Sequence, residues 1–236
     1  MAKGRRPLRA VRAHSPAQAP SALLEALKRR GPLTMRALAD HLAVTYEAVR
    51  QQMAELMREG WVVRERAGAS AGRPGPASRQ YRLSAAAEHL FPKHYDALSS
   101  EVLQHVLESF GGEALVKILT RMTEARVRHF APLLKSMTVK QKLKALCSLY
   151  EDKDSYMELE WQERAPALIE RNCPFFNVAQ AHPAICSVSV NTLERLLGVR
   201  VVREQRFQDG HGRCVFRVRL DEPRGEHEPF TPERAR

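Results

Sequence analysis

Three of the chain's four cysteines, Cys173, Cys186 and Cys214, are the side chains best suited to chemistry, and they are separated by 13 and 28 residues. Thiolates bind zinc and iron–sulfur clusters. These separations differ from the tight CxxC pairs of a zinc ribbon, so the spacing alone is a weak indication of a metal. Cys147 falls on the apolar stripe of a predicted helix and is expected to be a small buried hydrophobe. Four cysteines without an export signal favour a reducing compartment, and we expect a cytoplasmic protein.

The elements that must position these cysteines form a small α+β domain, predicted at residues 151–220. Residues 157–161 alternate as a strand does, and ALIERNC is the expected return strand. A helix is expected between residues 183 and 198, because a proline fits its first turn and a glycine its end. VRVVREQRF and RCVFRVRL then predict a hairpin closed by QDGHG. The three thiols would come from a strand end, a helix start and a strand start, and this fold could bring them to one end of the domain.

The charge of the chain is concentrated in its first third. The formal net charge is +11; residues 1–85 hold 16 Lys and Arg against 6 Asp and Glu, whereas residues 86–236 hold 22 against 21. This asymmetry predicts that one module faces a polyanion. Residues 1–19 are expected to be a flexible basic arm. No apolar run is long enough to cross a membrane, so no membrane partner is expected.

Three helical stretches between residues 20 and 60 have the spacing of a helix-turn-helix, with Ser21, Thr34 and Thr45 as expected N-caps. Two short alternating segments follow, joined by a loop rich in Gly, Ala, Ser and Pro, and they predict an arginine-bearing wing. A recognition helix contacts base edges from near its N-terminus, and a wing contacts the DNA backbone or minor groove. The expected DNA-binding residues are Thr45, Tyr46, Arg50, Gln51, Arg64, Arg66, Arg73 and Arg79.

The segment LTMRALADHLAVTYEAVRQQMAELMREGWV, followed by GRPGPASRQYRLS, resembles the winged helix of bacterial regulators of the ArsR and MarR type, with a DeoR-type helix-turn-helix. The likeness lies within residues 20–85 and includes the GRP turn of the wing. It implies binding to double-stranded operator DNA. Winged helices also serve as protein-interaction modules, but the basic charge and the arginines of the wing favour DNA.

Residues 86–150 predict long amphipathic helices, with apolar residues repeating at helical intervals on either side of Gly111 and Gly112. Operator half-sites are usually read in pairs, so we expect this region to be a homodimer interface or linker. Packing within one chain is the alternative, and the sequence does not separate the two.

The cysteine-bearing segment NCPFFNVAQAHPAIC, followed by LERLLGVRVVREQRFQDGHGRCVFRV, resembles the sensor domain of the iron–sulfur regulators that repress Suf-type cluster-assembly genes. With LFPKHY after the wing, the likeness runs from about residue 20 to residue 220. It implies that Cys173, Cys186 and Cys214 hold an iron–sulfur cluster, [4Fe-4S] rather than [2Fe-2S]. It also implies that the loaded form represses transcription and that loss of the cluster releases the operator.

The fourth ligand of such a cluster is open, because the hairpin segment REQRFQ lacks the further cysteine that some members of that family carry. His182 is the first candidate, since it lies four residues before Cys186 at the expected helix start, where both side chains can face one space. Imidazole in place of thiolate is compatible with a cluster. The alternative is a histidine that caps the helix or lies at the surface. His211, three residues before Cys214, is the second candidate.

These expectations together describe an α+β protein in which a winged helix-turn-helix precedes central dimerisation helices and a metal-sensing domain. The expected function is a homodimeric transcriptional regulator, a repressor of genes for cluster assembly or for redox and iron responses. The alternative is a winged-helix regulator with a structural zinc site, or with a small-molecule effector and no cluster. An enzyme is not expected, because no Gly-rich phosphate loop or acid–histidine pair accompanies the thiols. Residues 221–236, charged and proline-bearing, are expected to be disordered.

Overall fold

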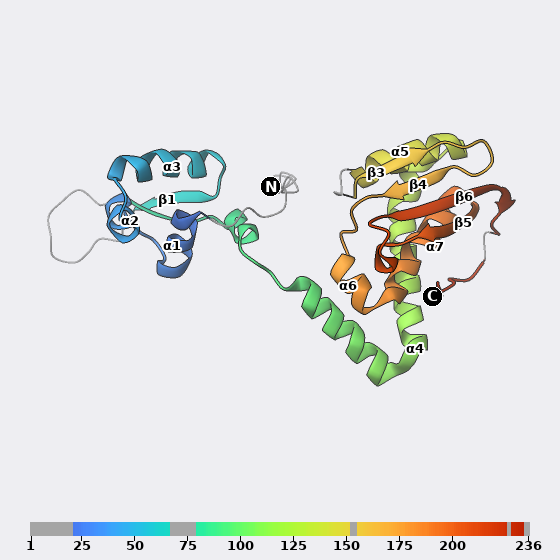
Figure 1. The fold of residues 1–236 in the computed structure, drawn as a ribbon. Coiled ribbons are helices and arrows are strands. Elements are labelled where there is room, and N and C mark those ends of the chain that lie inside the picture. Colours follow the sequence, from blue (N-terminus) through green and yellow to red (C-terminus); the bar gives the residue numbers. More distant parts are fainter. Residues whose placement is uncertain (1–20, 67–78, 152–154, 226–227, 234–236) are drawn as a thin grey trace, which may run out of the picture. The chain divides into compact units, whose positions relative to one another are not determined.

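The computed structural model describes residues 21–66, 79–151, 155–225 and 228–233, and the chain divides into two compact units between Lys93 and His94. The predicted basic arm at residues 1–19 lies outside the described residues. Helices and antiparallel strands occur in both units, which confirms the α+β class (Figure 1). No helix within the described ranges is long and apolar enough to cross a membrane.

The first unit consists of three helices and a two-stranded antiparallel hairpin. Each predicted cap is present: Ser21 Oγ accepts from the Leu24 N–H at 3.5 Å, Thr34 Oγ1 from Ala37 at 3.1 Å and Thr45 Oγ1 from Ala48 at 3.2 Å. These bonds satisfy N–H groups that have no partner inside the helix. The elements are α1 (Ala22–Arg30), α2 (Met35–Leu42), α3 (Tyr46–Arg58), β1 (Val62–Arg66), β2 (Arg79–Leu83) and the 3₁₀ helix η1 (Ala86–Leu90).

A single apolar core holds these elements together, formed by Leu23, Leu38, Val49, Met53 and Tyr81 with their neighbours. Leu33 and Tyr81 exchange two backbone hydrogen bonds, so the segment before α2 joins the hairpin as a third short strand. Leu90 and Phe91 also pack on this core. The first unit therefore extends to Lys93, past the boundary at residue 85 that the sequence predicts.

The second unit begins with a long helix, α4 (Tyr95–Phe130), that bends at Gly111. The backbone of Gly111 has φ 75° and ψ 177°, a conformation essentially restricted to glycine. Figure 1 shows two helical halves that meet at this bend. The remaining elements are η2 (Ala131–Leu134), α5 (Val139–Glu151), β3 (Met157–Glu160), β4 (Ala167–Glu170), α6 (Phe176–Ala181), η3 (Pro183–Cys186), α7 (Ser187–Leu197), β5 (Val199–Gln205), η4 (Phe207–Asp209) and β6 (Cys214–Pro223).

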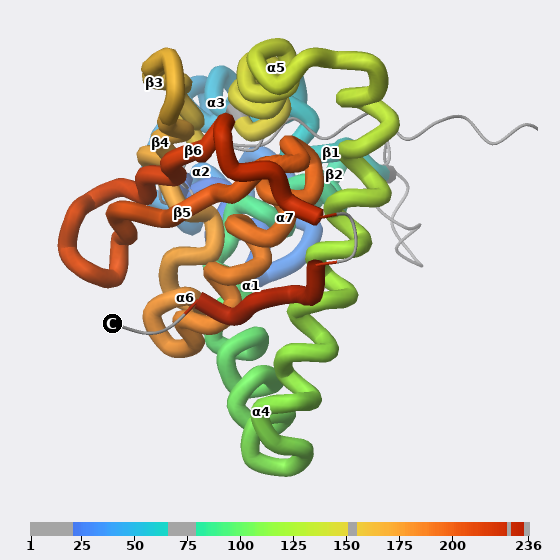
Figure 2. Tube along the Cα trace, turned by 90° about the vertical axis from the view of Figure 1, so that its right-hand side faces the viewer, coloured from blue at the N-terminus to red at the C-terminus, as the bar shows by residue number. Residues whose placement is uncertain are grey.

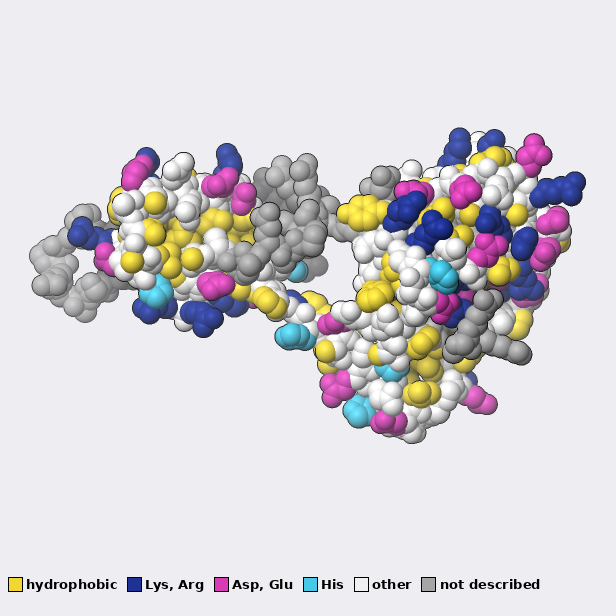
Figure 3. Space-filling model, in the orientation of Figure 1, with side chains coloured by type: hydrophobic (Ala, Val, Ile, Leu, Met, Phe, Trp, Pro, Cys, Tyr) yellow, Lys and Arg dark blue, Asp and Glu magenta, His cyan; other side chains and the backbone are white. Residues whose placement is uncertain are grey.

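The strands of the second unit form one antiparallel sheet in the order β3-β4-β6-β5. The two predicted hairpins are present, and pairing of β4 with β6 joins them. One face of the sheet carries Leu168, Phe216 and Val218 and packs on α5, α7 and the end of α4. The second half of α4 runs beside α7 (Figures 1 and 2). Basic and acidic side chains are interspersed over the visible face of this unit, in keeping with its nearly balanced charge (Figure 3).

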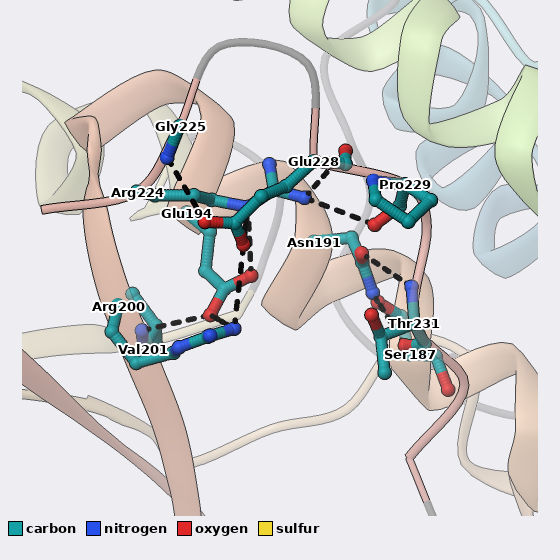
Figure 4. Close-up of polar contacts among 10 residues, drawn as sticks. All are labelled: Ser187, Asn191, Glu194, Arg200, Val201, Arg224, Gly225, Glu228, Pro229 and Thr231. Carbon is teal, nitrogen blue, oxygen red and sulfur yellow. Dashed lines mark hydrogen bonds and ion pairs between the residues drawn. The ribbon is translucent and has the colours of Figure 1, made fainter.

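The chain after residue 220 packs on the second unit instead of being disordered, as far as it is described. Strand β6 continues to Pro223, and Phe230 is buried against Leu115, Leu119 and Val188. Asn191 of α7 and Thr231 exchange two hydrogen bonds, of 2.9 and 3.0 Å (Figure 4). The charged side chains on which the prediction of disorder rests form ion pairs with the second unit. Arg224 Nε, for example, lies 3.2 Å from Glu194 Oε2 (Figure 4).

Candidate metal centre and nucleic-acid interface

Cys173, Cys186 and Cys214 lie at one end of the second unit's sheet. Cys214 is the first residue of β6, and its direct partner across the pair is Glu170, the last residue of β4. Cys173 follows Glu170 by three residues, in the turn before α6. Cys186 ends η3 and is the N-cap of α7. Strand pairing and the start of α7 thus bring the thiols from three elements toward one region.

Arg203 of β5 connects this region through a buried guanidinium. Its Nη1 donates to Cys214 Sγ at 3.3 Å, its Nη2 donates to the carbonyl oxygen of Cys186 at 2.7 Å, and its Nε donates to Glu233 Oε1 at 3.2 Å. The guanidinium also lies over the Phe216 ring, 4.6 Å from the ring centroid. One side chain therefore joins both hairpin strands, the start of α7 and the C-terminal segment.

A cavity of about 320 Å³ opens beside the cysteines. Cys173 and Cys186 line it, whereas Cys214 does not and is connected to it through Arg203. Charged side chains of both signs face the cavity, and its wall is otherwise apolar and hydroxyl-bearing. Its lining includes Arg126, Arg203, Glu170, Tyr150, Ser155, Ser189, Phe130 and Phe175.

Burial favours the uncharged forms of the three thiols and of Glu170. It raises the pKa of the Cys173 thiol to about 11, although a backbone hydrogen bond from Phe175 acts in the opposite direction. Burial also raises the pKa of Cys186 and of Cys214, against the attraction of Arg203. The pKa of Glu170 rises to about 7 through burial, despite the positive charges of Arg203 and Arg126. Metal binding at this place would have to release protons from the thiols.

The two histidines that were candidates for a fourth ligand contact backbone carbonyl oxygens and do not line the cavity. The Nε2 atom of His182 is 2.9 Å from the carbonyl oxygen of Ser100 in α4, and His182 does not line the cavity. The first half of α4 thus engages one ring nitrogen of His182, and its assignment as the fourth ligand stays a prediction. His211 is exposed, with Nδ1 3.3 Å from the carbonyl oxygen of Arg206.

Sequence reasoning did not single out Glu170 and Arg203. One sequence feature could have pointed to Glu170. It is a charged residue in the apolar strand segment ALIE, and by strand alternation it shares a face with Leu168. Its meaning depends on the pairing with Cys214, which the sequence does not display.

The thiols are not arranged around a single point. Among the described residues, no three His, Cys, Asp or Glu side chains are placed so that they could hold one metal ion in common. A single zinc ion requires every sulfur within about 2.3 Å of the metal.

The expected DNA-binding residues lie on the first unit. Thr45, Tyr46, Arg50 and Gln51 are exposed at the N-terminus of α3. Arg50 donates to Glu47 Oε2 from Nε at 2.8 Å, so its guanidinium is already engaged with a neighbouring acid.

The wing residues are described in part. Arg64 and Arg79 are exposed on β1 and β2. Arg66 ends β1, and its side chain is outside the description; Arg73 lies outside the described residues. Arg82, which the sequence also places on the wing, donates to Glu65 Oε2 at 2.8 Å.

A family of known proteins matches part of the first unit. The family model of MarR regulators matches residues 18–71, which contain α1, α2, α3 and β1. This match supports a winged-helix transcriptional regulator. Comparison of the chain with curated proteins gave no match.

Proposed function

We propose that this protein is a DNA-binding transcriptional repressor whose operator affinity is set by a [4Fe-4S] cluster held by Cys173, Cys186 and Cys214. The MarR-family match and the three capped helices support the DNA-binding part. The convergence of three thiols from separate elements at one end of a sheet, beside a cavity of about 320 Å³, carries the cluster part.

The residues present fit a cluster better than they fit a single ion. Thiolates are the usual ligands of iron–sulfur clusters, and Cys173 and Cys186 both line the cavity. Arg126 and Arg203 face the same cavity and offset the negative charge that thiolates would bring into a buried place. When bound, the cluster would supply a bond between elements that is sensitive to iron supply and to oxidants.

The chain offers a continuous route from this site toward the DNA-binding unit. Cys186 caps α7, and α7 packs along the second half of α4. Arg126 of α4 lies over the Phe175 ring at 5.4 Å, so α4 also contacts the turn that holds Cys173. Helix α4 is in turn the first element after the winged helix. Loss of the bond between the cysteines would loosen α7 against α4 and so change the operator-bound arrangement.

The first half of α4 supports the homodimer in this proposal. Tyr95, Leu98, Val102 and Phe110 are 65%, 58%, 52% and 73% exposed on it. Such a row of apolar side chains on one helix is typical of an interface, and a second copy of this chain is the partner that paired operator half-sites require. Leu98→Glu should convert a dimer to monomers in analytical ultracentrifugation. A dimer that persists in Leu98→Glu and in Val102→Glu would place the interface elsewhere.

The experiment that tests the proposal measures metal and DNA binding on one sample. The full chain is purified without air, its absorption spectrum is recorded, and iron, sulfide and zinc are assayed. Operator fragments are then titrated before and after the cluster is removed. We expect a brown protein with matched iron and sulfide, and weaker DNA binding after removal.

Cysteine variants make this test specific to the site. Cys173→Ser, Cys186→Ser and Cys214→Ser should each abolish cluster binding, whereas Cys147→Ser, on α5, should retain it. A colourless protein with stoichiometric zinc, or DNA binding that ignores the cluster, would contradict the proposal in favour of the zinc or effector alternatives.

A further inference from the structure

We propose that the carboxylate of Glu170 is the fourth ligand of the metal centre, beside the three cysteines. This inference rests on the proposed function and deepens it, because it names a fourth ligand for the metal centre. It also makes the centre a three-thiolate, one-carboxylate site.

The backbone fixes Glu170 among the cysteines. Glu170 and Cys214 are direct partners in the β4–β6 pair, so their side chains emerge on the same face of the sheet as close neighbours. Cys173 follows three residues later on the same chain segment, and Glu170, Cys173 and Cys186 all line one cavity. Glu170 thus adjoins each of the three thiols through strand pairing, sequence or the shared cavity wall.

The Glu170 carboxyl group is buried without a hydrogen bond or ion pair to another described residue. The residue is 8% exposed, and the positive charges of Arg203 and Arg126 act on it without a direct ion pair. Arg203 directs its three donor nitrogens at Cys214, Cys186 and Glu233 instead. A buried carboxylate without such a partner is costly unless it is protonated or bound by a ligand or metal. A carboxyl group that faces a cavity beside thiols is therefore placed to serve as a metal ligand once it loses its proton.

The surrounding charge suits four anionic donors. Two arginines, Arg126 and Arg203, face the cavity, and no lysine lines it among the described residues. Three thiolates and one carboxylate would leave a loaded cluster anionic, and both guanidinium groups are in place to offset that charge. His182 would add no charge, and its ring is turned to Ser100.

A carboxylate ligand would make one iron of the cluster more weakly bound than the other three. Carboxylate oxygen is a harder donor than thiolate, so it holds the iron of a sulfide-bridged cluster less firmly. The iron bound by Glu170 would be the first to exchange or to be lost, which makes this corner the one that responds to iron supply. The cysteines would meanwhile keep the rest of the group in place.

The test compares Glu170→Gln and Glu170→Cys with the wild-type chain after anaerobic reconstitution with iron and sulfide. Iron and sulfide per chain, the absorption spectrum and the electron paramagnetic resonance spectrum are measured. Glu170→Gln should lose about one quarter of the iron, as Fe²⁺, at unchanged sulfide. After one-electron oxidation with ferricyanide it should show the paramagnetic resonance signal of a [3Fe-4S]⁺ cluster. Glu170→Cys should keep full iron with a more thiolate-like spectrum. Glu160→Gln, an exposed glutamate on β3 of the same sheet, is the matched control and should resemble wild type.

The outcomes separate this inference from the proposed function. A wild-type chain that takes up no iron and sulfide overturns both. A wild-type chain with a cluster, together with a Glu170→Gln variant identical to it in iron content and spectra, overturns only the assignment of Glu170. A urea unfolding curve of the metal-free Glu170→Gln protein tests whether the variant is folded. If it is not, the iron content and spectra of Glu170→Cys test the assignment instead.

Discussion

Arg203 is the residue on which the candidate site depends most in the metal-free protein. Its three donor nitrogens hold Cys214 Sγ, the Cys186 carbonyl and Glu233, all in buried surroundings. Removing one partner of a buried charged network leaves the others desolvated and unpaired. Arg203→Met should therefore lower the free energy of unfolding by about 3 kcal/mol, measured by urea denaturation. Arg203→Lys keeps the positive charge but loses the planar set of three donor nitrogens. It should therefore lower the free energy of unfolding less than Arg203→Met does. Equal unfolding midpoints for wild type and Arg203→Met would contradict this role.

Glu170 should make the stability of the metal-free protein depend on pH. Its pKa in the folded protein is about 7, against an ordinary value of 4.5, so the folded state prefers the protonated carboxyl group. The contribution of this group is fully present below about pH 4.5, declines as pH rises, and is lost above about pH 7. The change corresponds to about 3 kcal/mol. Glu170→Gln should abolish this part of the dependence and be the more stable protein above pH 7. Parallel pH profiles for wild type and Glu170→Gln, from unfolding in urea at each pH, would show that Glu170 is not the group responsible.

At the scale of single residues, the sequence predicts contacts within one helix turn better than contacts between distant segments. The three N-caps of the first unit follow from local spacing, because a cap bonds within its own helix turn. The prediction for His182 rests on its proximity to Cys186 along the chain, but its ring meets Ser100, 82 residues away. Glu170 escapes sequence reasoning for the complementary reason, since its partner Cys214 lies on another strand.

Among the elements, α4 depends on one glycine. Gly111 has φ 75° at the bend, and no atom lies within 4 Å of the place a side-chain carbon would occupy, so a substitution there meets backbone strain and not a clash. Gly111→Ala should cost about 1 to 3 kcal/mol of unfolding free energy. Gly112→Ala is the matched control: the next residue has open space and no positive φ, so alanine should be neutral or slightly stabilising there. Thermal unfolding of the two variants side by side measures the difference, and equal melting temperatures would show that the bend is not held by Gly111.

The helices and hairpins are predictable because their signals are local, whereas the joining of elements is not. The break between the two halves of α4 coincides with the adjacent glycines, and both hairpins of the second unit follow from alternation and turn residues. The β4–β6 pairing that unites the hairpins leaves no mark in either strand alone. The packing of the C-terminal segment is not predictable from the sequence, because its charged residues pair with residues of α7 and β5. Arg224 pairs with Glu194, and Glu233 pairs with Arg203. Composition counts such charges but does not show that they are paired.

For the molecule as a whole, the uneven charge distribution leads to a quantitative prediction about DNA binding. The excess of basic residues lies in residues 1–85, which contain the family-matched winged helix. Arg64 and Arg79 are exposed on the wing strands, whereas Arg82 is paired with Glu65. Removal of an arginine that binds a phosphate weakens binding to all DNA sequences and reduces the salt dependence of affinity by about one unit of slope.

A homodimer presents each wing twice, so one substitution per chain should remove two phosphate-binding arginines. Arg64→Ala and Arg79→Ala should each reduce the slope of log affinity against log salt by about 2 in a dimer, and by about 1 in a monomer such as Leu98→Glu. Arg128→Ala is the control, because Arg128 is an exposed arginine of α4 in the nearly neutral unit and should leave the slope unchanged. Fluorescence anisotropy of a labelled operator duplex over a series of salt concentrations measures the slope for wild type, the three arginine variants, Leu98→Glu, and the two wing variants combined with Leu98→Glu. An unchanged slope in both wing variants would move the DNA contacts away from the wing strands, whereas equal reductions in the dimer and in Leu98→Glu would show that only one winged helix of the pair meets the DNA.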